Sequence, residues 1–302
     1  MTLDRTILSD ITVHMKYARF DSEKQRRETW EEIVERNKQM HVDRYSLLYN
    51  NNEEFRNTLN LTYDLVAQKK ILPSMRSMQF GGAAIKAANN RVYNCAFMPI
   101  DSFNAFSEAM FLLLGGTGVG YSVQNNNVEK LPARQDLSDT DSIRYQIGDS
   151  IEGWSDAVRE AVMSVMYGYP IEFDYTAIRP KGSIIKTSGG RAPGHEPLKT
   201  CIDRILKLLR DEVKVGYKMR PIVAHDIMCH LADAVLSGGI RRAAMIRLFD
   251  KYDDEMINSK TGLFWQDNPQ RMRANNSVVL DRESVVKEDF ERVWDVARHQ
   301  NS

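Results

Sequence analysis

The sequence predicts an α/β fold with largely parallel strands, preceded by a helical region over residues 1–70. From Ile71 onward, short runs of β-branched and aromatic residues alternate with amphipathic helical patterns, and glycine-containing turns lie between them. This alternation continues over more than 200 residues without an internal repeat. It is typical of strand–helix–strand units, in which consecutive strands run parallel.

The amino-terminal region, residues 1–70, is predicted to be helical and peripheral. Residues 22–41 are dense in charge, and Trp30, Ile33 and Val34 mark a narrow apolar stripe among them. That pattern is typical of a solvated helix with one docking edge. A second helix is predicted to end near Lys70.

The remaining residues, 71–302, are predicted to form helices wherever apolar side chains recur at helical spacing. Ser102 or Asp101 can cap the first of these helices, and Pro221 suits the first turn of another. Residues 124–149 are polar and are predicted to form a long loop. The predicted helices cover residues 102–114, 150–167, 196–213, 221–236 and 287–299, and the predicted strands cover residues 89–99, 243–249 and 277–280.

The composition of the chain excludes several classes of protein. Its 302 residues include 41 basic and 41 acidic side chains, so no net charge attracts nucleic acid or a membrane surface. Three widely spaced cysteines make neither a disulfide framework nor a zinc pattern, which suits a reducing compartment. No signal peptide or membrane-length apolar run is present. We therefore expect a cytoplasmic protein without a metal site, a nucleic-acid partner or a membrane partner.

Cys95 is the most informative residue in the sequence. It lies in the predicted buried strand over residues 89–99, directly after Asn94 and shortly before a glycine-rich turn. A thiol held on a rigid strand beside a polar side chain suits chemistry on a bound ligand, although a lone cysteine is more often a packing residue. Cys201 and Cys229 lie within predicted helices, and we interpret both as packing residues.

Three glycine-containing turns are candidate ligand sites. Residues 115–120 lack the spacing of a dinucleotide-binding motif and the lysine of a P-loop, so a tight helix-to-strand turn is the favoured reading. Residues 186–194 precede a helix and can form an anion cradle or an ordinary surface loop. In residues 237–243, Arg241 and Arg242 can bind phosphate or a base edge, or can be solvated.

Six short motifs occur in a fixed order along the chain: Pro73-Ser74-Met75-Arg76, Asn94-Cys95, residues 115–120, residues 179–182 leading into 188–194, residues 238–242, and residues 275–278. This ordered set resembles the catalytic subunit of ribonucleotide reductase. The match is to the adenosylcobalamin-dependent, class II, ribonucleoside-triphosphate reductase type. Each motif alone is weak, but their order and spacing cover nearly the whole chain.

The resemblance implies a ten-stranded α/β barrel made of two five-stranded halves, with residues 71–302 forming its first part, which carries the substrate and effector loops. It also implies a thiyl radical that abstracts a ribose hydrogen, loss of the 2′-hydroxyl as water, and a cysteine pair that supplies two electrons. Adenosylcobalamin is the implied cofactor. A ribonucleotide substrate, a deoxynucleoside triphosphate effector and a thioredoxin-like reductant are the implied partners.

The resemblance also assigns roles to individual residues. Cys95 matches the first cysteine of the reducing pair. Ser74, Asn94, Gly116 and Arg241 match positions near the substrate. The positions that match the effector-binding loops are Lys186, Ser188, Gly189, Gly190, Arg191, Gly238, Gly239 and Arg242.

The sequence departs from the family in two ways. No Asn-Pro-Cys motif for the thiyl cysteine is present, because Asn268-Pro269 is followed by Gln270, and no second reducing cysteine follows in the expected region. We therefore expect an amino-terminal portion, from a split gene or a truncated sequence, that needs a complementary carboxyl-terminal fragment to be active. The amino terminus is too short for the ATP-binding cone of many relatives, which implies specificity control without that switch.

Alternatives remain open at this point. A class I large subunit and a non-catalytic nucleotide-binding fragment are the rival functions. The choice between diphosphate and triphosphate substrates, and between a monomer and a homodimer, is likewise open.

Overall fold

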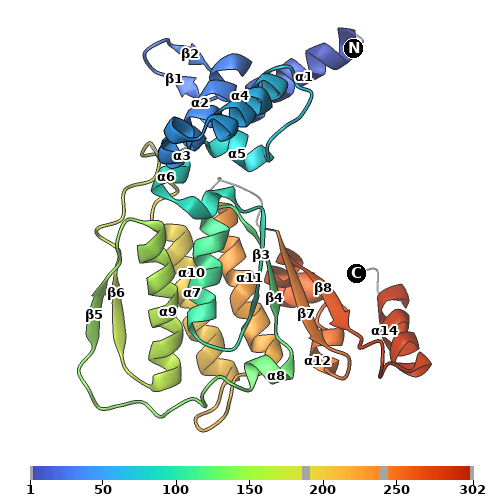
Figure 1. Cartoon of the computed structure of the whole chain (residues 1–302). Coiled ribbons are helices and arrows are strands. Elements are labelled where there is room, and N and C mark those ends of the chain that lie inside the picture. The colour runs from blue at the N-terminus through green and yellow to red at the C-terminus, as the bar shows by residue number, and fades with distance from the viewer. Residues whose placement is uncertain (1–2, 186–190, 238–243, 300–302) are drawn as a thin grey trace. The chain divides into compact units, whose positions relative to one another are not determined.

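The computed structural model describes residues 3–185, 191–237 and 244–299 (Figure 1). Its internal contacts divide the chain into two compact units, Met1–Asn94 and Cys95–Ser302. The division therefore falls immediately before Cys95, later than the predicted change of texture near residue 70.

The unit Met1–Asn94 is mainly helical, as predicted. A capping box between Thr29 and Glu32 begins α2, and the apolar stripe of that helix buries Ile33 and Val34. These side chains form a small core with Tyr63 and other residues of the unit. The elements are α1 (Leu3–Lys16), the hairpin β1 (Phe20–Asp21) and β2 (Arg26–Arg27), α2 (Trp30–Arg44), α3 (Ser46–Asn51), α4 (Glu53–Ala67), α5 (Met75–Phe80), α6 (Ala83–Ala87) and the 3₁₀ turn η1 (Asn89–Val92).

The unit Cys95–Ser302 is built on a four-stranded sheet with the order β3-β4-β7-β8. All neighbouring strands in this sheet run parallel, as the strand–helix alternation predicted. A second, two-stranded parallel sheet pairs β5 with β6. The strands are β3 (Cys95–Pro99), β4 (Gly118–Ser122), β5 (Ile143–Gln146), β6 (Ile171–Asp174), β7 (Met245–Asp250) and β8 (Ala274–Val279).

Four long helices form the core of this unit. Helix α7 contacts β3 and β4, α9 contacts β6, and α10 and α11 pack against them and against each other, so the helices lie between the two sheets (Figure 1). Ser150 caps α9, because its side chain accepts a hydrogen bond from the Gly153 N–H. Serine is one of the residues preferred at this position of a helix. The helices are α7 (Asn104–Leu114), α8 (Asn125–Val128), α9 (Ile151–Tyr167), α10 (Glu196–Glu212), α11 (Pro221–Ser237), α12 (Asp254–Ile257), α13 (Phe264–Asp267), η2 (Pro269–Arg273) and α14 (Lys287–His299).

The two faces of the four-stranded sheet differ in burial. Val119 and Tyr121 of β4 point toward the helices and are fully buried. On the opposite face, Phe97 of β3 is 59% exposed and Ile246 of β7 is 42% exposed. Gly120 lies between them, and a Cβ at this position would lie 3.0 Å from the Phe97 ring. Glycine at this position therefore lets the Phe97 ring lie across the neighbouring strand.

Three local predictions are wrong. The strand predicted over residues 89–99 begins only at Cys95 and is an edge strand with an exposed face, because residues 89–92 form a 3₁₀ turn. The loop predicted over residues 124–149 contains α8 and β5. Neither Asp101 nor Ser102 caps α7, since that helix begins after Phe103 without a side-chain cap.

None of the helices in the described part of the chain is long and apolar enough to span a membrane.

Candidate functional site

The four parallel strands begin along one side of the sheet, which we call its amino edge. The predicted site elements lie along this amino edge. Cys95 begins β3 and pairs in register with Gly118, which begins β4. Met245 and Ala274 begin β7 and β8 and pair with each other at the same edge. Parallel strands that start in register place their first residues side by side. The thiol, the glycine turn before β4 and the starts of β7 and β8 therefore share this edge.

The glycine turn before β4 has a specific backbone geometry. Helix α7 ends at Leu114, and Gly116 has a φ of 83°, in the left-handed region. The Gly116 N–H donates to the Leu113 carbonyl, and the Thr117 N–H donates to the Leu112 carbonyl. This arrangement closes a helix with glycine in the left-handed position. The predicted helix-to-strand turn is therefore present, and any contact of Gly116 with substrate remains a prediction.

Cys95 differs from the other two cysteines in its access to solvent. Its residue is exposed, whereas Cys201 and Cys229 are buried in α10 and α11. Burial raises the pKa of both buried thiols to about 12, so they are protonated and inert at neutral pH. The interpretation of Cys201 and Cys229 as packing residues is confirmed, whereas the predicted burial of Cys95 is wrong.

Asn94, the residue before Cys95, is held by a buried arginine. The Nε of Arg76 donates to the Oδ1 of Asn94 at 3.3 Å, and Arg76 is fully buried. Arg76 and Arg91 both lie over the ring of Phe80, with guanidinium carbons 5.4 and 5.6 Å from its centroid. Sequence reasoning included Arg76 in a motif but gave it no role. The sequence signal that could have drawn attention to Arg76 was its position in the motif, two residues after Ser74.

Ser74 has a structural task in this unit. Its Oγ accepts a hydrogen bond from the Ser77 N–H at 3.2 Å and so caps α5. A role for Ser74 near substrate remains a prediction.

The predicted effector loops fall mostly outside the described residues. Arg191 is described, and its Nη1 donates to the Gly182 carbonyl at 2.9 Å. Ile184 and Arg191 also form an isolated antiparallel bridge, so the two ends of this turn are held together. The residues outside the described part are Lys186, Ser188, Gly189, Gly190, Gly238, Gly239, Arg241 and Arg242.

A buried polar network lies on the helix side of the sheet. Tyr121 hydrogen-bonds the Nδ1 of His225 at 2.7 Å, and the Cys229 sulfur lies 3.5 Å from the His225 Nε2. Burial lowers the pKa of His225 well below its usual value, so this histidine is neutral at pH 7. Asp226 and Arg271 form a bidentate pair with distances of 2.8 and 2.7 Å. His225 and Asp226 are thus core residues whose polar groups have partners.

Arg247 on β7 belongs to the same region and was missed by sequence reasoning. It is fully buried, and it donates to the Met256 carbonyl and to Ser259. Burial lowers its pKa to about 10. Among the described residues, no group of three or more His, Cys, Asp or Glu side chains could hold a metal ion.

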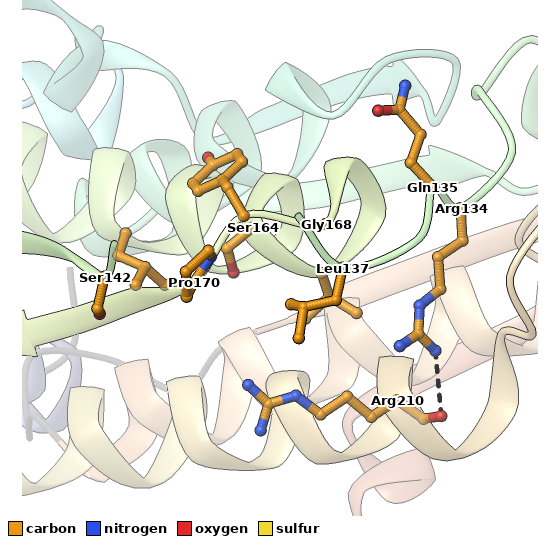
Figure 2. A pocket seen from close by; sticks show the side chains of 11 residues that line it. Arg134, Gln135, Leu137, Ser142, Ser164, Gly168, Pro170 and Arg210 are labelled. Carbon is orange, nitrogen blue, oxygen red and sulfur yellow. Dashed lines mark hydrogen bonds between the residues drawn. The ribbon is translucent and has the colours of Figure 1, made fainter. Parts of the chain in front are cut away.

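A cavity of about 260 Å³ lies at the carboxyl-terminal ends of α9 and α10 (Figure 2). Arg134 and Arg210 line it, but the Nη1 of Arg134 donates to the carbonyls of Val213 at 2.5 Å and Arg210 at 3.2 Å. Arg134 therefore closes the end of α10. Helix carboxyl termini carry partial negative charge, which disfavours an anion at this place.

Comparison with known proteins bears on the fold and on the family resemblance. No protein-family model matches the chain. A probable adenosylcobalamin-dependent ribonucleoside-triphosphate reductase of Dictyostelium discoideum is 29% identical over 91% of this chain and 40% of its own length. The reductase of that name from Lacticaseibacillus paracasei is 26% identical over 90% of this chain and 44% of its own. The one from Euglena gracilis is 28% identical over 70% and 30%.

A solved structure shows the same fold. The crystal structure of a B-12-dependent, class II ribonucleotide reductase matches with a TM-score of 0.75 at 24% identity, covering 92% of this chain and 48% of that one. The resemblance to class II ribonucleotide reductases is thereby confirmed, and the predicted α/β fold with it. The chain spans less than half the length of these relatives.

Proposed function

We propose that this chain is the amino-terminal part of a class II ribonucleotide reductase, an enzyme that converts ribonucleotides to deoxyribonucleotides for DNA synthesis. The relatives that cover most of the chain are named adenosylcobalamin-dependent ribonucleoside-triphosphate reductases, which favours triphosphate substrates and class II over class I. The observation that carries the proposal is the exposed Cys95 at the amino edge of a parallel sheet, beside the glycine turn before β4.

Cys95 acts as one half of a dithiol reductant. Two cysteine thiols lose two electrons and two protons and form a disulfide, while the C2′–O bond of the ribose breaks and the hydroxyl leaves as water. Cys201 and Cys229 are buried among the helices and do not suit the second thiol. The second cysteine and the thiyl cysteine come from a complementary carboxyl-terminal segment. A thioredoxin-like protein then reduces the disulfide, which agrees with a reducing cytoplasm.

The edge strand gives Cys95 the rigidity that this task demands. Misplacement of a reacting group by about 1 Å can cost on the order of 10²-fold in rate. Backbone pairing of β3 with β4 fixes Cys95, and the buried Arg76 fixes Asn94 before it. We propose that the substrate is bound by Ser74, Asn94, Gly116 and Arg241. The deoxynucleotide effector is assigned to the loops around residues 186–191 and 238–242.

Adenosylcobalamin would supply the radical, and the relatives are named adenosylcobalamin-dependent. The described residues do not fit it. His225 and His230 are buried, and no described cluster of side chains could hold a metal ion. We therefore assign no cobalamin contact to the described residues.

The test combines this chain with its complementary carboxyl-terminal chain and measures deoxynucleotide formation with adenosylcobalamin and a dithiol. We expect Cys95→Ser to abolish multiple turnover and the buried Cys201→Ala to retain it. Multiple turnover by Cys95→Ser would contradict the proposed role. Activity that needs a metal-bearing partner subunit instead of adenosylcobalamin would indicate class I. Deoxynucleotide binding without any turnover would indicate a non-catalytic module.

A further inference from the structure

Two buried arginines, Arg76 and Arg91, lie over the ring of Phe80 in the unit Met1–Asn94, and the proposed reaction uses only the contact of Arg76 with Asn94. Arg76 is fully buried and Arg91 is 6% exposed, and both guanidiniums lie over the Phe80 ring. Burying like charges side by side is costly unless opposite charge compensates them. The question is therefore what neutralises the charge of Arg91.

Arg91 has no hydrogen-bond acceptor among the described residues. Its Nε is fully buried and unpartnered, and no described carboxylate lies within ion-pair distance of its guanidinium. Burial lowers the pKa of Arg91 because the charged form loses its hydration. The side chain of the preceding residue, Asn90, is in the same state, with both its Nδ2 and its Oδ1 buried and unpartnered. Buried polar groups in native proteins almost always have partners.

Arg19 adds a second positive charge nearby, which Glu28 offsets only in part. Its Nε and Nη2 donate to the Gln79 carbonyl at 3.3 and 3.2 Å, and no described carboxylate pairs with its guanidinium. Burial and the charge of Arg36 lower the pKa of Arg19 to about 10, the charge of Glu28 opposes this shift, and Arg91 adds to it. Glu28 accepts hydrogen bonds from Arg36 at 2.7 and 3.0 Å and from the backbone N–H of Arg19 at 3.0 Å, so its charge is shared between the two arginines.

We propose that Arg91, with Asn90 and Arg19, forms a binding site for a phosphoryl group. The planar fork of arginine matches two oxygens of a phosphate, and the phosphoryl anion balances the charge of Arg91 and the part of the Arg19 charge that Glu28 leaves. The Asn90 Nδ2 supplies a further donor. The site does not depend on reductase chemistry, and the phosphoryl group can come from a nucleotide or from free phosphate.

Arg134 shows why an unpartnered Nε alone does not indicate a ligand. Its Nε is also buried without a partner, but its Nη1 donates to carbonyls at the end of α10, and Figure 2 shows this side chain directed to that helix end. The fork of Arg134 thus has a structural acceptor, whereas the fork of Arg91 has none. Arg134 is therefore the matched control for Arg91.

The experiment measures the thermal unfolding midpoint of the purified chain against inorganic phosphate, tripolyphosphate, ATP and adenosine, with chloride holding the ionic strength constant. The wild type is expected to be stabilised by one or more of the phosphoryl compounds and not by adenosine. Arg91→Met should unfold no lower than the wild type without ligand, because it removes an unpaired buried charge. Its apparent affinity should fall by about 10- to 100-fold, as expected for a lost charge-assisted hydrogen bond.

The control variant should behave in the opposite way. Arg134→Met is expected to unfold at a lower temperature and to keep the phosphate response. A response to inorganic phosphate that Arg91→Met weakens identifies a site for the single anion, and a response to tripolyphosphate or ATP alone that Arg91→Met weakens identifies a site for a phosphate chain. A wild type that no phosphoryl compound stabilises would overturn the proposal, as would an Arg91→Met variant that binds as tightly as the wild type. If Arg91→Met does not fold, Asn90→Ala provides the same test, with a several-fold loss of affinity expected.

Discussion

The Nε of Arg76 donates a hydrogen bond to the Oδ1 of Asn94 at 3.3 Å, and this contact orients the side chain directly before Cys95. Arg76 is fully buried, and its guanidinium lies over the ring of Phe80. A side chain fixed on several sides can hold a neighbour in one orientation. Arg76 is thus a positioning residue for the proposed substrate contact of Asn94.

Replacing Arg76 tests this positioning role in the reassembled enzyme. Arg76→Gln is expected to lower kcat by about 10- to 100-fold, because small misplacements near the reacting atoms are costly. Asn94→Ala should lower kcat comparably, and the double variant should be no worse than the stronger single variant, since the two act as one unit. Steady-state kinetics of the three variants measures this coupling. Additive losses would show that Arg76 does not act through Asn94.

Gly120 allows the Phe97 ring to lie across the sheet. A Cβ at Gly120 would lie 3.0 Å from the Phe97 Cδ2 and 3.4 Å from the Ile246 Cγ2. Gly120→Ala is therefore expected to lower the free energy of unfolding by about 1–3 kcal/mol through overpacking. Urea unfolding measures the change, and Gly148→Ala, whose Cβ would meet only Gly153 at 3.7 Å, is the control. Adding Phe97→Leu to Gly120→Ala should restore part of the loss.

Stability is expected to fall in mild acid because His225 is buried in its neutral form. Burial lowers its pKa in the folded protein below the unfolded value of about 6.5, so the unfolded chain binds more protons. The contribution of neutral His225 to the free energy of unfolding is complete above a pH of about 6.5. It is lost as the pH falls below that value, by up to about 1.4 kcal/mol per pH unit. The pKa of His230 is also lowered by burial, so this residue acts in the same direction.

Urea unfolding between pH 7.5 and 5.5 measures this dependence. His225→Gln, which keeps a hydrogen-bonding group opposite Tyr121, should show a smaller slope than the wild type. An unchanged slope in this variant would show that His225 does not cause the loss of stability.

The buried pair of Asp226 and Arg271 provides a stability test in the core. Asp226 is 3% exposed and accepts two hydrogen bonds from Arg271. Arg271→Met would leave the carboxylate buried and unpaired, at a cost of about 3–5 kcal/mol. The exposed pair of Lys207 and Asp211 is the control, and Lys207→Ala should cost no more than about 0.5 kcal/mol. Equal losses in both variants would contradict the assignment of a buried pair.

The sequence predicted the long helices well because their patterns are local. Helices α9, α10 and α11 begin within one residue of the predicted positions, and the Ser150 cap and Pro221 mark two of those starts. The strand β5 was missed because its alternating pattern lasts only four residues, Ile143 to Gln146, and because the strand depends on its pairing with β6. Short strands of this kind are specified by tertiary contacts more than by local propensity.

The candidate site was predicted only in part. Motif order identified Cys95, but its exposure was misjudged, since an edge strand and a central strand have similar local composition. Arg76, Arg91 and Arg247 are buried arginines that sequence patterns assign to the surface. Their burial depends on partners far away in the sequence or, for Arg91, on the phosphoryl ligand that we propose.

The most direct test of the central claim is a single turnover of the reassembled enzyme without external reductant. Free thiols are alkylated at successive times, and the fraction of free Cys95 is measured by peptide mass spectrometry beside the amount of deoxynucleotide formed. We predict that free Cys95 disappears in a one-to-one ratio with product, while Cys201 and Cys229, alkylated after unfolding, remain free thiols. Product formation with Cys95 still a free thiol would contradict its role as the reductant.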